Sequence, residues 1–372
     1  MKISAYLPIL YCKGIKPLLL GKPIPNHGKG EIPMAEKHLG RQTVRFSRPP
    51  TICTGAAIGG AAESTGPLGP YFDWCSPDLY FGEKTWEQGE SAMVGQCFQL
   101  ACRKAKLAPE DLQYVLAGDL LNQCIGSAFG LKDSGIPYFG LYGACSTMAE
   151  GLSLGAMLLD GGYADALCAA TCSHFCSSER QFRLPLEYGG QRPPTTQWTA
   201  TAAGAAILTA AGSGPYLTHV TTGRIRDLGI TDANNMGAAM APAAYDTLRA
   251  HFADTGRSPD YYDAIFTGDL GRLGHQIVAE QFLQDGFDLA GRYFDCGLLL
   301  FDQKRQDVHA GGSGCGCAAA ALCGYILAML RKGVWHRVLF SATGALLSAT
   351  SASQGATIPG ICHAVAIETE VE

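Results

Sequence analysis

Cys145 stands in the stretch YGACSTMAEG, between small residues, after a short apolar run and before a segment with the pattern of a helix. A strand-to-helix turn of this kind can present a nucleophile. The N–H groups and positive end of a helix that begins near Ser146 would lower the pKa of the thiol, and they could also hold an oxyanion. The alternative is that Cys145 is simply a small buried residue. The turn favours the geometry of a nucleophile, but this geometry alone does not establish catalytic activity.

Three other patterns suggest sites that their surroundings do not support. Cys168, Cys172, His174 and Cys176 lie two or four residues apart in CAATCSHFC, but the second ligand pair of a zinc site is not evident in the sequence. We therefore predict buried thiols here and no metal site. GGSGCGC lacks the Lys-Ser/Thr of a phosphate loop, and GGAAESTG is not followed at the right distance by the acidic residue of a dinucleotide fold.

The elements that must position Cys145 occur in two copies. PEDLQYVLAGDLLNQ begins at Pro109 and PDYYDAIFTGDLGRL begins at Pro259, and each runs from Pro through acidic residues and an apolar strand to Gly-Asp-Leu. An amphipathic stretch with apolar residues at helical spacing precedes each copy, at 84–106 and 235–255. The sequence therefore indicates a duplicated unit.

The later parts of the two halves also correspond. A small-residue turn leads into a long apolar helix in each half, and two strands follow it. These elements are expected at 143–162, 165–173 and 201–210 in the first half and at 311–333, 336–343 and 361–371 in the second. Alternating strands and helices predict largely parallel sheets with covered faces. We predict two sheets that sandwich the two Gly/Ala-rich helices.

The predicted organisation of the chain follows from this repeat. Residues 1–50 are an N-terminal extension, residues 51–226 are the first half, and residues 227–372 are the second half. A chain of 372 residues with 47% hydrophobic and 16% charged residues can bury a core of this size.

Charge and composition exclude several classes of function. The net charge of −5, without a block of like charges, argues against nucleic acid as a partner. No apolar run reaches the roughly 18 residues of a membrane span, and the first residues are too polar and too interrupted by Pro and Gly for a secretion signal. The 15 cysteines are then expected as free thiols in a reducing compartment.

Three motifs resemble the thiolase/β-ketoacyl synthase superfamily. YGACSTMAEGL is similar to its nucleophile elbow, VHAGGSGCG (308–316) to the histidine loop of its second half, and GALLSATSASQG (344–355) to its C-terminal glycine-rich loop. The resemblance implies two βαβαβ halves around buried helices, in α/β/α/β/α layers. It also implies that Cys145 holds the acyl-accepting position.

Four longer strings resemble one family of that superfamily, stage V sporulation protein AD from spore-forming bacteria. They are RFSRPPTICTGAAIGGAAESTGPLG, FRLPLEYGGQRPPTTQWT, HAGGSGCGCAA and QGATIPGICHAVAIE. The resemblance implies a thiolase-like fold in a non-enzymatic use, namely the binding of pyridine-2,6-dicarboxylate (dipicolinate). It further implies a channel complex at the forespore inner membrane, with peripheral attachment through other stage V sporulation proteins, and uptake of dipicolinate in sporulation and its release in germination.

The resemblance also defines which partners Cys145 would need as a condensing enzyme, usually two His, or His and Asn, from the second half. His309 can fill one role. Asp269 stands near the point where the other is expected, and His275 comes about two turns later. An anionic Asp269 would raise the pKa of the thiol and repel an enolate, which is the wrong sign for condensation. Acyl transfer by a Cys145–His309 pair remains open.

A site for the dipicolinate dianion should offer Arg or Lys and a flat apolar wall, whereas calcium dipicolinate could use Asp269 and backbone oxygens on the metal. The segment SSERQFRLPLEYGGQRPPTTQW groups the candidate residues Arg180, Arg183, Tyr188, Arg192 and Trp198. Solvated surface arginines are the alternative interpretation. We predict that this segment forms part of the ligand site, with no cofactor other than calcium that enters with the ligand.

The sequence therefore predicts a dipicolinate-binding protein whose cysteine elbow is inherited architecture. The alternative function is a thiolase-like acyltransferase with Cys145 as its nucleophile. By resemblance a homodimer through a first-half strand is possible.

Overall fold

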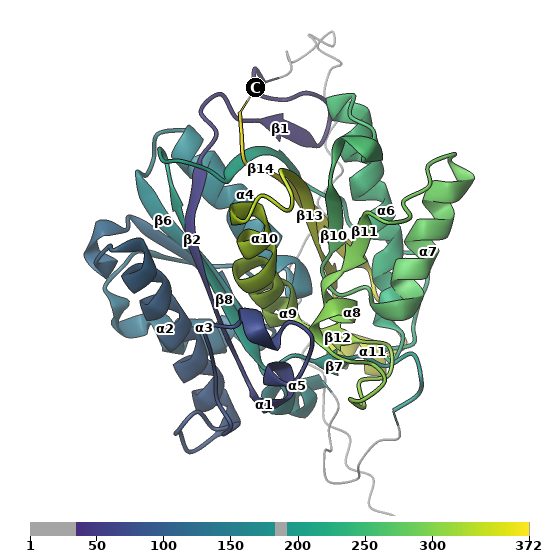
Figure 1. Ribbon diagram of the computed structural model, residues 1–372. Helices are drawn as coiled ribbons and strands as arrows, with labels where there is room; N and C mark the ends of the chain where they lie inside the picture. Colours follow the sequence, from purple (N-terminus) through teal and green to yellow (C-terminus); the bar gives the residue numbers. More distant parts are fainter. Residues whose placement is uncertain (1–34, 183–191, 372) are drawn as a thin grey trace, which may run out of the picture. The chain divides into compact units, whose positions relative to one another are not determined.

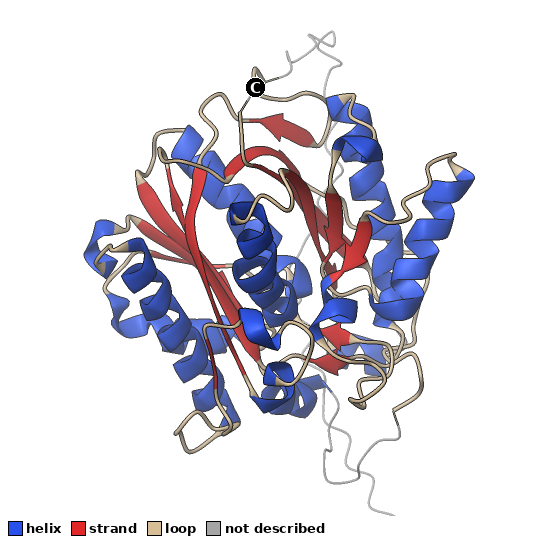
Figure 2. Cartoon of the chain, in the orientation of Figure 1, coloured by secondary structure: helices blue, strands red, loops and turns tan. Residues whose placement is uncertain are grey.

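A computed structural model of the chain describes residues 35–182 and 192–371. Lys37–Glu372 form one compact unit. Figure 1 gives the element labels used below, and Figure 2 separates the helices of this unit from its strands.

One set of strands, here the first limb, belongs to the first half of the chain. It consists of β2 (Thr51–Gly59), β8 (Ala202–Thr209), β6 (Ala166–Ser173), β4 (Tyr114–Gly118) and β5 (Tyr138–Gly140), in this spatial order. β8 is antiparallel to both of its neighbours, and β6, β4 and β5 run parallel. All eight residues of β6 are buried, as expected for a strand covered on both faces.

The second limb repeats this arrangement strand by strand. It consists of β9 (Tyr216–Thr221), β14 (Gly360–Glu368), β13 (Arg337–Ala345), β10 (Ala264–Thr267) and β11 (Tyr293–Asp295). β14 is again antiparallel to both neighbours, and β13, β10 and β11 are parallel. The predicted duplicated α/β fold is confirmed. The two predicted sheets are, however, continuous, because Thr51 of β2 pairs with Tyr216 of β9.

Helices rich in small residues lie between the limbs, as Figure 1 shows for α4, α9 and α10. They are α4 (Thr147–Asp160) and the continuous run of α9 (Cys315–Ala320), a π-helical turn η8 (Ala321–Ile326) and α10 (Leu327–Arg331). The approach to the strands is close: a Cβ atom at Gly204 would lie 2.4 Å from the backbone of Ala319. The predicted central layer of Gly/Ala-rich helices is therefore present, and its largest apolar cluster joins both limbs.

Outer helices cover the other face of each limb. α2 (Trp86–Ala105) and α3 (Ile125–Leu131) pack beside the first limb, and α6 (Met236–Thr255) and α7 (Gly271–Gln284) beside the second. The two long helices match the amphipathic stretches predicted at 84–106 and 235–255. Thr85 caps α2 and Asn235 caps α6, each accepting a hydrogen bond from a backbone N–H of the first turn.

Shorter elements complete the unit. They are β1 (Thr43–Arg45), α1 (Ala61–Ser64), β3 (Trp74–Cys75), α5 (Phe175–Phe182), β7 (Trp198–Thr199), α8 (Cys296–Leu300), β12 (Gly312–Ser313) and α11 (Ala349–Ser353). β7 and β12 pair with each other and link the two halves of the chain.

The strand pattern also bears on the predicted domain boundaries. Within the predicted extension 1–50, β1 pairs with β9, so the residues from Lys37 onward belong to the compact unit. The repeat of the second limb starts at Tyr216, ahead of the boundary predicted between residues 226 and 227. Because both halves lie in one unit, that boundary stays a prediction.

Candidate functional site

The cysteine elbow forms as predicted. After β5 the chain makes a 3-10 turn at Ala144–Ser146 and enters α4 at Thr147. Ala144 has a φ of 51°, a left-handed conformation that is uncommon for a residue with a side chain and that concentrates at functional sites. β13 of the second half packs against the turn, where a Cβ atom at Gly344 would lie 2.7 Å from Gly143 O. Cys145 is 6% exposed.

Asp269, from the second copy of Gly-Asp-Leu, meets the thiol of Cys145. This carboxylate is fully buried and accepts hydrogen bonds from Gly314 N (2.8 Å), Ser313 Oγ (3.1 Å) and Thr343 Oγ1 (2.9 Å). The Cys145 thiol donates a further hydrogen bond to it. Elements from both halves therefore converge on one carboxylate.

The surroundings of Cys145 disfavour its thiolate form. Burial raises the pKa of the thiol well above its ordinary value, and the charge of Asp269 and the neighbouring Cys315 raise it further. The N–H of Gly314 opposes this shift but does not outweigh it. The expectation that the helix end lowers the pKa of Cys145 is therefore wrong, because burial and Asp269 dominate. The expectation that Asp269 raises it is confirmed.

Both candidate histidines have partners other than Cys145. His309 donates from Nδ1 to Pro193 O (2.9 Å), and its Nε2 lies 2.9 Å from a carboxylate oxygen of Asp307. His275 stacks on Tyr293 with 4.2 Å between ring centroids. Neither ring is among the described residues that line the cavity next to Cys145. The structure brings Cys145 and Asp269 together and leaves both histidines elsewhere.

A cavity of about 580 Å³ opens next to the elbow. Cys145, Gln197 and Ser313 form what we call its buried end, since each is less than 8% exposed. The walls come from both halves of the chain. They include Leu120, Asn122, Tyr142, Gln181 and Phe182 from the first half, and Asn234, Met236, Leu347 and Ser348 from the second.

Arg180 and Arg192 of the predicted arginine cluster form ion pairs and are not among the described residues that line the cavity. Arg180 forms a bidentate pair with Glu87 and lies over the Trp86 ring. Arg192 pairs with Asp307 at 2.6 Å and lies over the ring of Trp198. Their positions do not support the predicted role in ligand binding. Arg183 and Tyr188, from the same cluster, lie outside the described residues.

Gln197 is a cavity residue that the sequence did not point to. Its Nε2 donates to Asp269 O (2.7 Å) and Gly312 O (2.8 Å), so it ties the cavity to the loop of Asp269. It directly precedes β7, a two-residue strand too short to leave a periodic signal in the sequence. Its position depends on the pairing of β7 with β12.

The side chains of the cysteine-rich stretch CAATCSHFC have separate partners in the structure. Over residues 35–182 and 192–371 no group of three or more His, Cys, Asp or Glu side chains could hold a metal ion. His174 contacts Leu79 O at 2.7 Å, and the Cys172 thiol donates to Glu90. Cys168 is buried in the core under α2.

The described helices offer no candidate membrane span, because none combines the length and the apolar character that a crossing requires.

Comparisons with known proteins match both the sequence and the fold. A family model described as stage V sporulation protein AD matches residues 40–368. Stage V sporulation protein AD of Bacillus subtilis (strain 168) is 42% identical over 332 residues, which cover 89% of this chain and 98% of that protein.

Solved structures of low sequence identity share the fold. One is 3-oxoacyl-[acyl-carrier-protein] synthase III from Aquifex aeolicus VF5, with a TM-score of 0.52 and 13% identity over 86% of this chain and 99% of that one. Another is cerulenin-bound OleA from Xanthomonas campestris, with a TM-score of 0.57 and 13% identity over 87% and 98% of the two chains. The thiolase-like fold implied by the cysteine elbow is thereby confirmed.

Proposed function

The chain belongs to the stage V sporulation protein AD family, and from this premise we propose that it binds dipicolinate in the cavity beside Cys145. In this role it serves a spore channel complex, in dipicolinate uptake during sporulation and its release in germination. The observation that carries the proposal is the cavity itself. It lies beside the cysteine elbow, and the Cys145 thiol donates a hydrogen bond to the Asp269 carboxylate.

The cavity suits a small flat ligand with polar edges. Its volume of about 580 Å³ lies within the usual range of small-molecule sites. Leu120, Phe182 and Met236 offer apolar surface for an aromatic ring, and Asn122 and Asn234 offer amide groups for its carboxyl oxygens. Calcium, where it enters, is part of the ligand.

The alternative, a thiolase-like acyltransferase that uses Cys145, has weaker support. Such a reaction needs a thiolate and a base that can move a proton. Here burial and Asp269 raise the pKa of the thiol, and His309 contacts Asp307 and Pro193 instead. The elbow is therefore well formed for binding and poorly equipped for turnover.

Two measurements on the purified chain distinguish these functions. Dipicolinate should raise the melting temperature in a dose-dependent way, because a ligand that binds only the folded state stabilises it. A short acyl thioester should leave no mass increment on Cys145. An increment that disappears in Cys145→Ser, without stabilisation by dipicolinate, would instead establish the acyltransferase.

The channel assignment has two further parts. The chain attaches peripherally to the forespore inner membrane through other stage V sporulation proteins. It also forms a homodimer through β5, the edge strand of the first limb, where Tyr138 and Phe139 are 38% and 47% exposed. Sedimentation of Phe139→Lys against the unchanged chain tests the dimer, and a monomeric unchanged chain contradicts it.

A further inference from the structure

Cys145 and Cys315 bring two thiols together beside the cavity, one from each half of the chain. They pack with Leu120 in one small buried cluster. The 3-10 turn Ala144–Ser146, which carries Cys145, contacts α9, which begins at Cys315. The N–H of Gly314, the residue before Cys315, also lies against the Cys145 sulfur. The fold therefore holds side by side two thiols that are far apart in the sequence.

The two thiols differ in their access to the cavity. Cys145 is 6% exposed and lines the cavity, whereas Cys315 is 0% exposed and is not among the described residues that line it. Among the fourteen described cysteines, Cys145 alone belongs to this lining. A small reagent in the cavity therefore meets Cys145 first, and Cys315 is the neighbour behind it. A reactive cysteine beside a resolving cysteine has this arrangement.

Both sulfur atoms are available for reaction. The Cys145 thiol donates its proton to the Asp269 carboxylate, and the Cys315 thiol donates to Cys172 O at 2.9 Å. Each hydrogen bond uses the proton of the thiol and leaves the lone pairs of its sulfur unoccupied. Neither cysteine is in a disulfide. The two thiols can therefore bond to each other once one of them is oxidised.

We propose that Cys145 and Cys315 are a modification site, where hydrogen peroxide that enters the cavity converts the two thiols into a disulfide. In the first step the Cys145 sulfur attacks one peroxide oxygen, the O–O bond breaks, and the thiol proton leaves with the other oxygen as water. In the second step the Cys315 sulfur attacks the sulfenic sulfur of Cys145. The S–O bond breaks, and the hydroxyl group leaves with the Cys315 proton as a second water. Two thiols are oxidised and one peroxide is reduced.

The surroundings of the pair decide the relative rates of the two steps. The first step is slow, because the thiolate is the nucleophile and burial and Asp269 disfavour it. The second step is intramolecular, since the fold already holds Cys315 against Cys145, whereas a second peroxide has to enter from solvent. The structure thus favours a disulfide over further oxidation of Cys145 to a sulfinic acid.

Oxidation of the full chain with hydrogen peroxide tests the pair. The treated chain is denatured in an alkylating reagent, digested and mapped by mass spectrometry. We expect peptides joined through Cys145 and Cys315, which dithiothreitol separates. The cross-link should form faster as the pH rises from about 7 to 9, because the thiolate fraction of Cys145 increases. Oxidation of Cys53, which is exposed, verifies that the peroxide is active.

Two variants identify the resolving thiol. Cys315→Ser should abolish the cross-link, and dimedone, which reacts with sulfenic acids, should then label Cys145. Cys124→Ser is the matched control, because the Cys124 thiol is also buried in this region and donates to Leu141 O at 3.0 Å. The control should keep the cross-link. Melting curves verify that each variant folds, and the mapping of the unchanged chain tests the pair without any variant.

Several outcomes would overturn the inference. One is a sulfinic Cys145 beside an intact Cys315 thiol in the unchanged chain, because the second step then fails. Another is an unmodified Cys145 under conditions that oxidise Cys53, because peroxide then does not reach the thiol. A Cys145 cross-link that survives in Cys315→Ser, or one that is lost in Cys124→Ser, would assign a different partner. The experiment contains no dipicolinate, so each of these results leaves the proposed function standing.

Discussion

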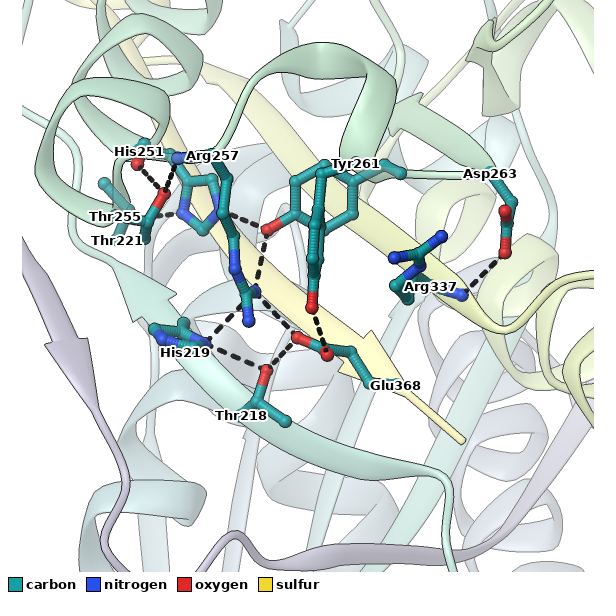
Figure 3. A network of polar contacts seen from close by, with 11 residues as sticks. Thr218, His219, Thr221, His251, Thr255, Arg257, Tyr261, Asp263, Arg337 and Glu368 are labelled. Carbon is teal, nitrogen blue, oxygen red and sulfur yellow. Dashed lines mark hydrogen bonds and ion pairs between the residues drawn. The ribbon is translucent and has the colours of Figure 1, made fainter. Parts of the chain in front are cut away.

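Asp269 and Glu368 are both buried carboxylates in the second half, yet their surroundings differ in kind. Glu368, at the end of β14, accepts from Arg257 Nη1 (2.8 Å), Tyr261 OH (3.0 Å) and Thr218. Figure 3 shows this cluster, which we call the Arg257 network. Asp269 is held by neutral donors, namely a thiol, two hydroxyls and one backbone N–H.

The Arg257 network satisfies its own members. His219 and His251 both lie in it, and His251 bridges Thr221 and Tyr262. The guanidinium groups of Arg257 and Arg337 lie 4.1 and 4.6 Å from the centroid of the Tyr261 ring. Among the buried polar atoms without a partner in the described part of the chain, none belongs to this network.

Two such atoms, Gln197 Oε1 and Ser178 Oγ, belong to residues that line the cavity next to Cys145. A buried charge that is fully paired within the protein serves stability and specificity of packing. Unsatisfied polar atoms beside an open volume indicate instead a place that a ligand completes. The comparison of the two carboxylates shows that burial alone does not identify a functional site. Unsatisfied polar atoms next to a cavity do indicate one.

Breaking the Arg257 network should have the largest effect. Arg257→Met removes the cation and leaves Glu368, which is 3% exposed, as an unpaired buried charge. Such a loss costs about 3–5 kcal/mol of unfolding free energy, measured by urea denaturation. Arg224→Met, which breaks the exposed pair with Asp246, is the matched control and should leave the urea midpoint unchanged. Equal midpoints for both variants would contradict the structural role of the network.

Some of the structural features behind these effects could be predicted from the sequence, and others could not. The repeated Gly-Asp-Leu and the spacing of apolar residues predicted the two limbs, because strand and helix periods are local properties. The resemblance to condensing enzymes, and not the periodicity, placed Asp269 near Cys145. The direction of His309 was not predictable, because it depends on a φ of 50° and on the neighbours Pro193 and Asp307. Gln197 likewise has its position only once β7 pairs with β12 of the other half.

Acid should weaken the Arg257 network through its histidines. Burial, with Arg257 as a further cause, lowers the pKa of His219 to about 4 and that of His251 to about 3. The unfolded chain, with ordinary histidine pKa values near 6.5, then binds more protons than the folded one, so stability is lost as pH falls from about 6.5 toward 3. Arg45, Arg257 and Glu368 are the charges that act on His219.

The measurement is the slope of unfolding free energy against pH between 4.5 and 6.5 in the unchanged chain and in His219→Gln. We expect a shallower slope in the variant, by up to about one proton, or roughly 1.4 kcal/mol per pH unit. Subtracting the two slopes cancels the contributions of Glu63 and Asp295. Their pKa values are raised to about 7, so these two groups change the stability with pH in the opposite direction. Identical slopes would show that His219 is not held neutral by the fold.

The two copies of Gly-Asp-Leu supply a test of the carboxylate beside Cys145 and a matched control for it. Asp269→Asn removes the negative charge beside Cys145, which lowers the pKa of the thiol and raises its thiolate fraction, so alkylation of Cys145 should accelerate by about tenfold. Asp119→Asn is the matched control, because Asp119 accepts from Ser127 and Leu121 N within the first half. Rates come from mass spectrometry of the Cys145 peptide after timed iodoacetamide treatment. Equal acceleration in both variants would mean that altered access, and not charge, controls the thiol.

The smallest effects are expected at the arginines that border the site. Arg180→Ala and Arg192→Ala should each change the unfolding free energy by less than about 1 kcal/mol, because both guanidinium groups form partly exposed ion pairs. Both variants should bind dipicolinate with the affinity of the unchanged chain. The reason is that Glu87 and Asp307 already pair with the two arginines outside the cavity lining. A tenfold loss of affinity in Arg192→Ala would show that its pair with Asp307 opens when the ligand enters. The cavity would then recruit a cation on binding, and the contrast between Asp269 and the permanently paired Glu368 would hold only for the unliganded protein.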